Sequence, residues 1–172
     1  LYREAMNIYR ESLGPESGHL ANTMVNLAIL LEEELNEYDE AELLYEGAIR
    51  IGESLYSDEN VIVAGWRRAY GGFLCVVQEK SADGATQIRA ALPILEREYS
   101  PGSEQVVAAR SMLGYCLTDL GEFEQAEEQL LRTLYDSQSG LGPDHSRTQQ
   151  ARERLVRLYE AWERPEQADE YR

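Results

Sequence analysis

The chain has 172 residues, of which 43% are apolar and 28% are charged, a composition typical of a folded protein with a core of its own. The formal net charge of −16 argues against sequence-independent binding to nucleic-acid backbones or anionic membrane surfaces. No apolar run approaches the roughly 18 residues that a membrane-spanning helix needs.

Apolar residues recur at spacings of three and four, which predicts amphipathic helices. Residues 1–17 contain one such helix and are expected to be the second helix of a pair, a partial repeat. In residues 18–60, one apolar stripe is followed by Asn36, which we expect to cap the next helix at its N-terminus, and then by a second stripe. The two stripes are Ala21, Met24, Leu27, Ala28, Leu31 and Leu35, and then Ala41, Leu44, Tyr45, Ala48 and Ile49.

The unit at residues 61–102 follows the same pattern in degenerate form. Its first helix contains Gly71 and Gly72, which either permit tight packing or mark a flexible helix. Its second helix contains Pro93 and is expected to kink near Arg89.

Two further units complete the chain. Residues 103–144 begin at Ser103, a predicted N-cap. Residues 145–172 form the terminal unit, in which Pro165 is expected at the first position of the last helix.

Two landmarks repeat with the same period. A small residue recurs beside acidic residues at spacings of 43, 42 and 42, and a Leu-Gly-Pro-Glu/Asp segment returns after 128 residues, which is three periods. Each helix pair leaves an apolar face that only a neighbouring pair can cover. The sequence therefore predicts an all-α stack of antiparallel helix pairs. The recurring small residues are Ala41, Gly84, Ala126 and Ala168.

The remaining chemistry-bearing residues suggest no reaction. Cys75 and Cys116 lie among apolar neighbours and are expected to be two buried thiols. His19 and His145 are 126 residues apart in corresponding loop positions, which favours a repeat position over a paired site. The run at 32–34 of three glutamates is expected to be a solvated helix face. We therefore expect no enzymatic activity, no cofactor and no metal.

Several motifs carry a resemblance to a known family, and the resemblance covers essentially the whole chain. It implies a right-handed α–α superhelix (solenoid) in which the first helix of each pair lines a concave groove. The pattern of Leu113, Gly114, Leu117, Phe123, Ala126, Leu130 and Thr133 resembles the tetratricopeptide repeat (TPR). The period of 42, the Asn26-Leu27-Ala28 segment and the Leu-Gly-Pro loop are similar to the kinesin-light-chain type of repeat and to repeats of bacterial signalling proteins.

The resemblance also implies candidate groove residues, which are found by counting back from the repeat alanine. Their amide, hydroxyl, ring and guanidinium groups suit a peptide ligand. The candidates are Asn22, Val25 and Ile29, then Arg67 or Arg68 with Gly71, then Ser111, Tyr115 and Thr118, and finally Glu153, Arg157 and Glu160.

Two functions follow as alternatives. The first is a protein–protein interaction module that binds a peptide or partner segment in the groove, as the scaffold or regulatory part of a larger, cytoplasmic bacterial protein; a start at Leu1 leads us to expect such a fragment. The second is a spacer or homo-oligomerisation array without a peptide ligand, paired through the apolar edge of the N-terminal helix. Neither involves nucleic acid or a membrane. That edge consists of Leu1, Met6, Ile8 and Tyr9.

Overall fold

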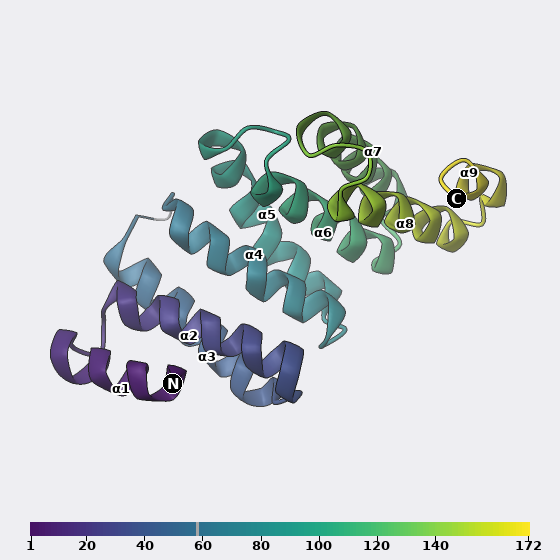
Figure 1. Cartoon of the computed structure of the whole chain (residues 1–172). Coiled ribbons are helices and arrows are strands. Elements are labelled where there is room, and N and C mark those ends of the chain that lie inside the picture. Colours follow the sequence, from purple (N-terminus) through teal and green to yellow (C-terminus); the bar gives the residue numbers. More distant parts are fainter. Residues whose placement is uncertain (58) are drawn as a thin grey trace.

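Antiparallel helices stacked into a curved superhelix make up the computed structural model, which describes residues 1–57 and 59–172 (Figure 1). The two termini lie at opposite ends of the stack, and no strand occurs in the described ranges. The predicted all-α superhelix is confirmed. The helices are α1 (Tyr2–Leu13), α2 (Gly18–Leu30), the π-helical η1 (Leu31–Leu35), α3 (Tyr38–Leu55), α4 (Val61–Val76), α5 (Ser81–Glu98), α6 (Glu104–Asp119), α7 (Phe123–Gly140), α8 (Ser146–Ala161) and α9 (Pro165–Asp169).

Helices pair in chain order. The pairs are α2 (continued by η1) with α3, α4 with α5, α6 with α7, and α8 with α9, while α1 packs against α2. The first helices α4, α6 and α8 also contact one another directly, so that they form a continuous layer along one side of the stack. Side chains that project from this layer share one face of the protein, which we call the inner face.

The first helix of every pair begins at a residue whose side chain accepts a hydrogen bond from a backbone N–H of the first turn. Such a cap satisfies a donor that the helix itself leaves free. The predicted cap at Ser103 is confirmed, and Pro165 occupies the first position of α9 as expected. The capping residues are Ser17, Asn60, Ser103 and His145.

Asn36 does not cap α3, contrary to expectation. It ends η1 in the left-handed conformation, with φ at 55°, and α3 begins after Glu37 without a side-chain cap. The chain turns back sharply here, and asparagine adopts the left-handed conformation more easily than most residues. The same backbone conformation recurs after the first helix of each later pair, at Glu79, Gly121 and Glu163.

Gly71 serves close packing. A Cβ atom there would lie 2.6 Å from Cγ1 of Ile88 and 2.8 Å from the carbonyl oxygen of Gly84. The backbones of α4 and α5 therefore touch where both residues are glycine, which explains why Gly84 replaces the alanine of the other units. Gly114 plays the same part in α6, since a Cβ there would lie 2.5 Å from Cγ of Leu130.

Helix α5 contains Pro93 and yet runs unbroken from Ser81 to Glu98. Pro93 and Arg89, whose carbonyl oxygen loses its usual helical donor, are both exposed, so water can satisfy the free acceptor. The proline expected to kink the helix does not interrupt it.

The cysteines form a disulfide, so the expectation of two buried thiols is wrong. Cys75 and Cys116 are 41 residues apart, close to one repeat period, and therefore lie on the neighbouring first helices α4 and α6. Their Cα atoms are 5.7 Å apart, within the usual range for a disulfide. Both residues are buried, as expected.

Aromatic side chains fill the junction between α3 and α4. The rings of Tyr45 and Tyr70 stack with centroids 5.5 Å apart, and Phe73 lies 5.6 Å from Tyr45. Trp66 covers Gly52, where a Cβ would lie 2.8 Å from the indole ring. Shape and apolar burial therefore hold these two pairs together.

Candidate functional site

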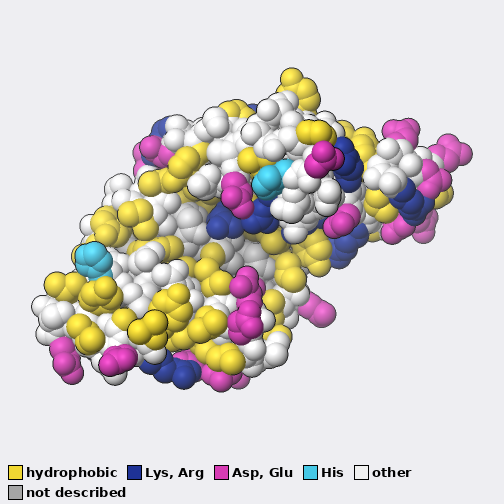
Figure 2. Space-filling model, viewed as in Figure 1, with side chains coloured by type: hydrophobic (Ala, Val, Ile, Leu, Met, Phe, Trp, Pro, Cys, Tyr) yellow, Lys and Arg dark blue, Asp and Glu magenta, His cyan; other side chains and the backbone are white. Residues whose placement is uncertain are grey.

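Four arginines from two helices gather on the inner face, and two of them, Arg154 and Arg157, contact the ring of one tyrosine. Arg68 comes from α4, and Arg147, Arg154 and Arg157 come from α8, while Tyr115 projects from α6 between them. We call the four arginines the arginine cluster. Figure 2 shows basic side chains gathered near the middle of the face in view, where α4 and α8 lie in Figure 1.

Tyr115 is the platform of the cluster. The guanidinium carbon of Arg157 lies 4.1 Å from the centroid of its ring, and that of Arg154 lies 5.2 Å away, both within the range of cation–π attraction. Arg154 Nη1 also donates a hydrogen bond of 2.8 Å to Oγ of Ser111. These contacts fix the guanidinium groups without neutralising their charge.

The cluster holds more positive charge than its carboxylate partners compensate. Arg147 lies 3.5 Å from Glu104 and Arg157 pairs with Asp119, but within the described residues Arg68 and Arg154 have no carboxylate partner. Nη1 of Arg157 is buried and lacks an acceptor in the same part of the chain. In a chain of net charge −16, this local excess of positive charge runs against the average.

Burial makes the two unpaired charges costly to hold. Burial first, and repulsion from Arg147 second, lower the pKa of Arg154 to about 10. The same two causes, in the same order, lower the pKa of Arg68. Both groups stay charged at neutral pH, because arginine is protonated far above it. Since a nearby anion favours the charged form, binding one would offset part of this cost.

The repulsion between Arg68 and Arg147 also indicates that the inner face is concave. The two residues belong to α4 and α8, which are separated in the stack by α6. Their charges interact across α6 because the layer of first helices curves inward.

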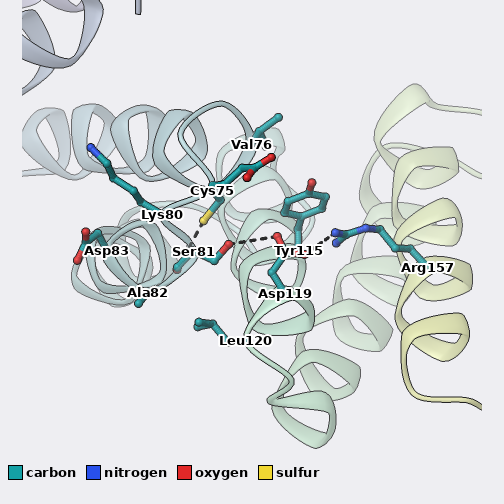
Figure 3. A pocket seen from close by; sticks show the side chains of 11 residues that line it. Cys75, Val76, Lys80, Ser81, Ala82, Asp83, Tyr115, Asp119, Leu120 and Arg157 are labelled. Carbon is teal, nitrogen blue, oxygen red and sulfur yellow. Dashed lines mark hydrogen bonds and ion pairs between the residues drawn. The ribbon is translucent and has the colours of Figure 1, made fainter. Parts of the chain in front are cut away.

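A pocket of about 580 Å³ adjoins the cluster where α4 ends and α5 begins (Figure 3). Cys75, Tyr115 and Arg157 line it, together with residues of the first turn of α5. Three carboxylates, those of Glu79, Asp83 and Asp119, also line it. That of Asp119 is already engaged, because Arg157 pairs with one oxygen and Ser81 Oγ donates to the other at 3.1 Å. The pocket offers room for a side chain of a bound segment.

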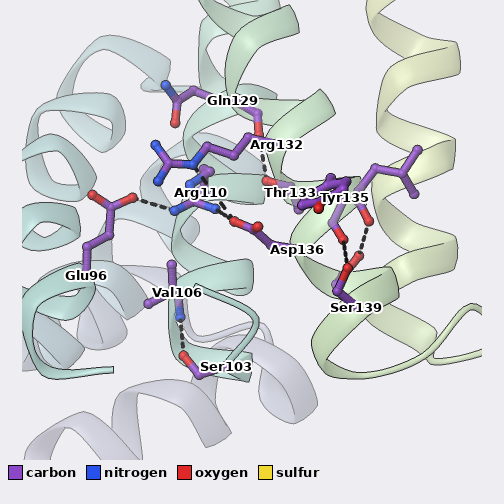
Figure 4. Close-up of polar contacts among 12 residues, drawn as sticks. Glu96, Ser103, Val106, Arg110, Gln129, Arg132, Thr133, Tyr135, Asp136 and Ser139 are labelled. Atoms are coloured by element: carbon purple, nitrogen blue, oxygen red, sulfur yellow. Dashed lines mark hydrogen bonds and ion pairs between the residues drawn. The ribbon is translucent and has the colours of Figure 1, made fainter. Parts of the chain in front are cut away.

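A fifth arginine of the inner layer has both terminal nitrogens engaged by carboxylates, while its buried Nε has no acceptor among the described residues (Figure 4). Arg110 is completely buried and donates hydrogen bonds of 2.5 Å to Glu96 of α5 and to Asp136 of α7. It thereby ties α6 to both neighbouring second helices. Its charge is used inside the fold, whereas Arg68 and Arg154 present theirs on the inner face.

The structure brings together only part of the predicted groove. Arg68, Ser111, Tyr115 and Arg157 meet at the cluster, although Ser111 itself is buried beneath Arg154. Asn22 and Glu153 are exposed, whereas Ile29 is half-buried and packs against the N-terminal core.

Three predicted residues do not point into the groove. Val25 is a buried core residue, and Thr118 is buried with its hydroxyl donating to the carbonyl of Gly114 at 2.8 Å. Arg67 turns away from the cluster and pairs with Glu53 of α3. Counting from the repeat alanine misplaces such residues because each step along a helix turns the side chain by about 100°, so an error of one position moves it to a different side.

Sequence reasoning missed Arg147 and Arg154. A signal was present, since Arg147, Arg154 and Arg157 are separated by seven and then three residues, which places them on one face of a helix. Their meeting with Arg68 depends on the curvature of the stack and has no counterpart in local sequence.

The described ranges contain no cluster of side chains suited to a metal ion. No group of three or more His, Cys, Asp or Glu side chains there could hold a metal ion. His145 caps α8, and His19, expected in a loop, lies in the first turn of α2 and stacks on Tyr9. Nor does any described helix combine the length and apolarity needed to cross a membrane.

Comparisons with known proteins agree on one family. Two family models, both described as tetratricopeptide repeat, match residues 1–54 and residues 106–147. No curated protein matches the sequence.

Solved structures share the whole fold. A crystal structure of nearly identical TPR-like repeats, from a Podosopora anserina protein assigned as a kinesin light chain, is similar with a TM-score of 0.84 and 16% identity, over 99% of this chain and 79% of that chain. A second structure of these repeats has a TM-score of 0.81 at 16% identity, over 99% and 80%. BtubC (BKLC) from P. vanneervenii has a TM-score of 0.79 at 20% identity, over 99% and 70%.

Proposed function

Because the chain is a tetratricopeptide repeat protein of the kinesin-light-chain-like type, we propose that its inner face binds an acidic segment of a partner protein. Repeats of this family are protein-interaction scaffolds and are generally not enzymes, and the chain belongs to that class. The context that we propose is a larger bacterial protein, in which the array is the scaffold or regulatory part. The support for this context is the sequence resemblance to repeats of bacterial signalling proteins.

The observation that carries the proposal is the uncompensated charge of the arginine cluster. Arg68 and Arg154 are held partly buried without a carboxylate partner in the described residues, and Arg154 is oriented by Ser111 and Tyr115. Glutamate and aspartate side chains match such groups, because a carboxylate accepts two hydrogen bonds from one guanidinium. The long-range field of the acidic chain favours basic partners, so the cluster supplies local selection against that field.

The pocket beside Tyr115 gives the proposed segment a second contact. A side chain that follows the acidic residues can enter the space between Tyr115 and the start of α5. An extended segment can therefore place carboxylates on Arg154 and Arg157 and an adjoining side chain in the pocket. The contact with Tyr115 is the one that we expect to set the orientation.

Self-association through the N-terminal helix receives less support. Of the four residues of that apolar edge, Met6 is buried and Tyr9 is half-buried against His19. Only Leu1 and Ile8 remain exposed, which is too little apolar surface to define a stable interface.

Fluorescence anisotropy with a fluorescein-labelled hexaglutamate peptide tests the proposal. Hexaglutamate is expected to bind more tightly than hexaglutamine, and Arg154→Gln to weaken its binding about tenfold, the effect of losing one charge-assisted hydrogen bond. Arg10→Gln, on the exposed surface of α1, is the matched control and is expected to change the affinity less than about twofold. Equal affinities for hexaglutamate and hexaglutamine, or equal effects of the two substitutions, would contradict the proposal.

A further inference from the structure

The disulfide lies directly beside the proposed binding surface. Cys116 follows Tyr115 in the chain, and Cys75 lines the pocket that Tyr115 and Arg157 also line (Figure 3). The bond links α4, which carries Arg68, to α6, which carries the tyrosine platform. It is therefore a covalent tie between the helix that carries Arg68 and the helix whose Tyr115 contacts Arg154 and Arg157.

Packing leaves the sulfur atoms little freedom to separate by themselves. Both cysteines are buried, and Sγ of Cys75 fills the space that a side chain at position 84 would need, where the chain has glycine. Two thiols need more room than a bonded pair, because non-bonded atoms cannot approach to bonding distance. Since the close contact of α4 with α5 blocks movement on one side, reduction has to be accommodated by a shift of α6 relative to α4.

Links between α6 and α5, the pair partner of α4, keep the fold intact when the bond is broken. Ser81 of α5 donates to Asp119 of α6, and Arg110 of α6 binds Glu96 of α5. Both cysteines also belong to an apolar core shared by α4 through α8. Reduction is therefore expected to loosen the α4–α6 contact without unfolding the protein.

We propose that the Cys75–Cys116 pair is a redox switch of the inner face, with the disulfide holding the arginine cluster in its tight-binding arrangement and a dithiol reductant releasing it. The effect on affinity rests on the proposed function, whereas the effect on the α4–α6 contact does not. Orienting groups before binding lowers the free-energy cost of association, so the oxidised form is the tighter binder.

The chemistry is an ordinary thiol–disulfide exchange. A thiolate of the dithiol attacks Sγ of Cys75 from the pocket, and Cys116 leaves as a thiolate and takes up a proton. The second thiol of the reductant then closes its own disulfide and releases Cys75. Two electrons pass from the dithiol to the protein, and both cysteines end as thiols.

Dithiothreitol serves as the probe reductant on the whole chain. Oxidised and reduced protein are compared in hexaglutamate anisotropy and in hydrogen–deuterium exchange, with alkylation and mass spectrometry to count free thiols. Reduction is expected to release two thiols, to weaken hexaglutamate binding about threefold to tenfold, and to speed exchange in α4 and α6 but not in α2. The double substitution Cys75→Ser with Cys116→Ser is expected to behave like the reduced protein. Its hexaglutamate affinity and its exchange rates should not change when dithiothreitol is added.

The outcomes separate this inference from the proposed function. If hexaglutamate binds neither form while exchange in α4 and α6 rises on reduction, the proposed function fails and the redox-sensitive contact stands. If both forms bind hexaglutamate equally, or if exchange in α4 and α6 does not change on reduction, the switch is overturned. Because binding and exchange are also measured on the reduced native chain, the test decides between these outcomes even if the double variant does not fold.

Discussion

The first helices at the two ends of the stack carry opposite charge. Residues 18–35, which form α2 and η1, contain no lysine or arginine and include three consecutive glutamates. Helix α8 contributes three of the four arginines of the cluster, and α4 contributes the fourth. The net charge of −16 is therefore unevenly distributed between the two ends. The affinity for a bound segment would depend on the order of the charges along that segment as well as on their number.

The two halves also differ in what holds them together. Stacked rings of Tyr45, Tyr70 and Phe73 join α3 to α4, whereas the buried ion pairs of Arg110 and the disulfide tie α5, α6, α7 and α4 together. Apolar packing tolerates small shifts, but a buried charge requires its partners in place. The C-terminal half, which carries three of the four arginines of the cluster, is thus held by ion pairs and a covalent bond as well as by apolar packing.

The largest effect on stability is expected from Arg110→Ala. Removing the guanidinium leaves Glu96 without a counter-charge and the mostly buried Asp136 with only the exposed Arg132 beside it, which we expect to lower the free energy of unfolding by about 3–5 kcal/mol. The exposed Arg132, 3.9 Å from the same Asp136, is the matched control, and its alanine substitution should cost about 1 kcal/mol or less. Urea denaturation measures both, and equal losses would refute the distinction.

A smaller effect is expected where α4 and α5 touch. Gly71→Ala places a methyl group against the backbone of Gly84, and we expect it to lower the free energy of unfolding by about 1–3 kcal/mol. At Gly47 the added methyl meets only the flexible end of Met24, so Gly47→Ala should be neutral or slightly stabilising, because alanine favours the helix. Thermal unfolding of the two variants compares them directly; a loss at Gly47 as large as that at Gly71 would contradict this account.

Neighbouring arginines provide a sharper test of the binding surface. Arg68→Gln is expected to weaken hexaglutamate binding about threefold to tenfold, because it removes an unpaired charge of the cluster. Arg67, one residue earlier, is engaged with Glu53 and with Oε1 of Gln87, so Arg67→Gln should change the affinity by about twofold at most. Titration by fluorescence anisotropy distinguishes the two, and the reverse order would place the site between α3 and α5.

The smallest effect on stability is expected at Glu32 in η1, at the acidic end of the stack. Burial, partly offset by a hydrogen bond from Tyr45, raises the pKa of Glu32. A carboxylate with a raised pKa destabilises the folded state above that pKa and has no such effect below its unfolded value of about 4.3. Glu32→Gln is therefore expected to add about 0.5 kcal/mol or less at pH 7. The gain should vanish as the pH falls towards 4; a constant gain in denaturation curves across this range would exclude the titration of Glu32 as its cause.

Local sequence was sufficient for much of the fold. Helical spacing, the cap at Ser103 and the small residues at the helix contacts follow from interactions within one helix or one turn, which the sequence displays directly. Asn36 was misread because asparagine suits both a cap and a left-handed helix end, and only the sharp return of the chain decides between them.

The candidate site was predictable only in part. Tyr115, Arg68 and Arg157 were found through the repeat. The number of unpaired charges, however, depends on which way each arginine points and which carboxylates lie near it, and in both respects Arg67 differs from Arg68. The disulfide was not predicted from the sequence because it, too, depends on tertiary packing. Its cysteines, Cys75 and Cys116, meet only when two helices of different pairs pack with those faces together.

Arginine side-chain nuclear magnetic resonance tests the central claim most directly. With nitrogen-15-labelled arginine, the Nε signals are followed while unlabelled hexaglutamate is added to the oxidised chain. The signals of Arg68, Arg154 and Arg157 are expected to shift together and to saturate at one affinity, while those of Arg10 and Arg132 stay in place. Uniform small shifts of all arginines, or saturating shifts confined to residues outside the cluster, would contradict an acidic-segment site on the inner face.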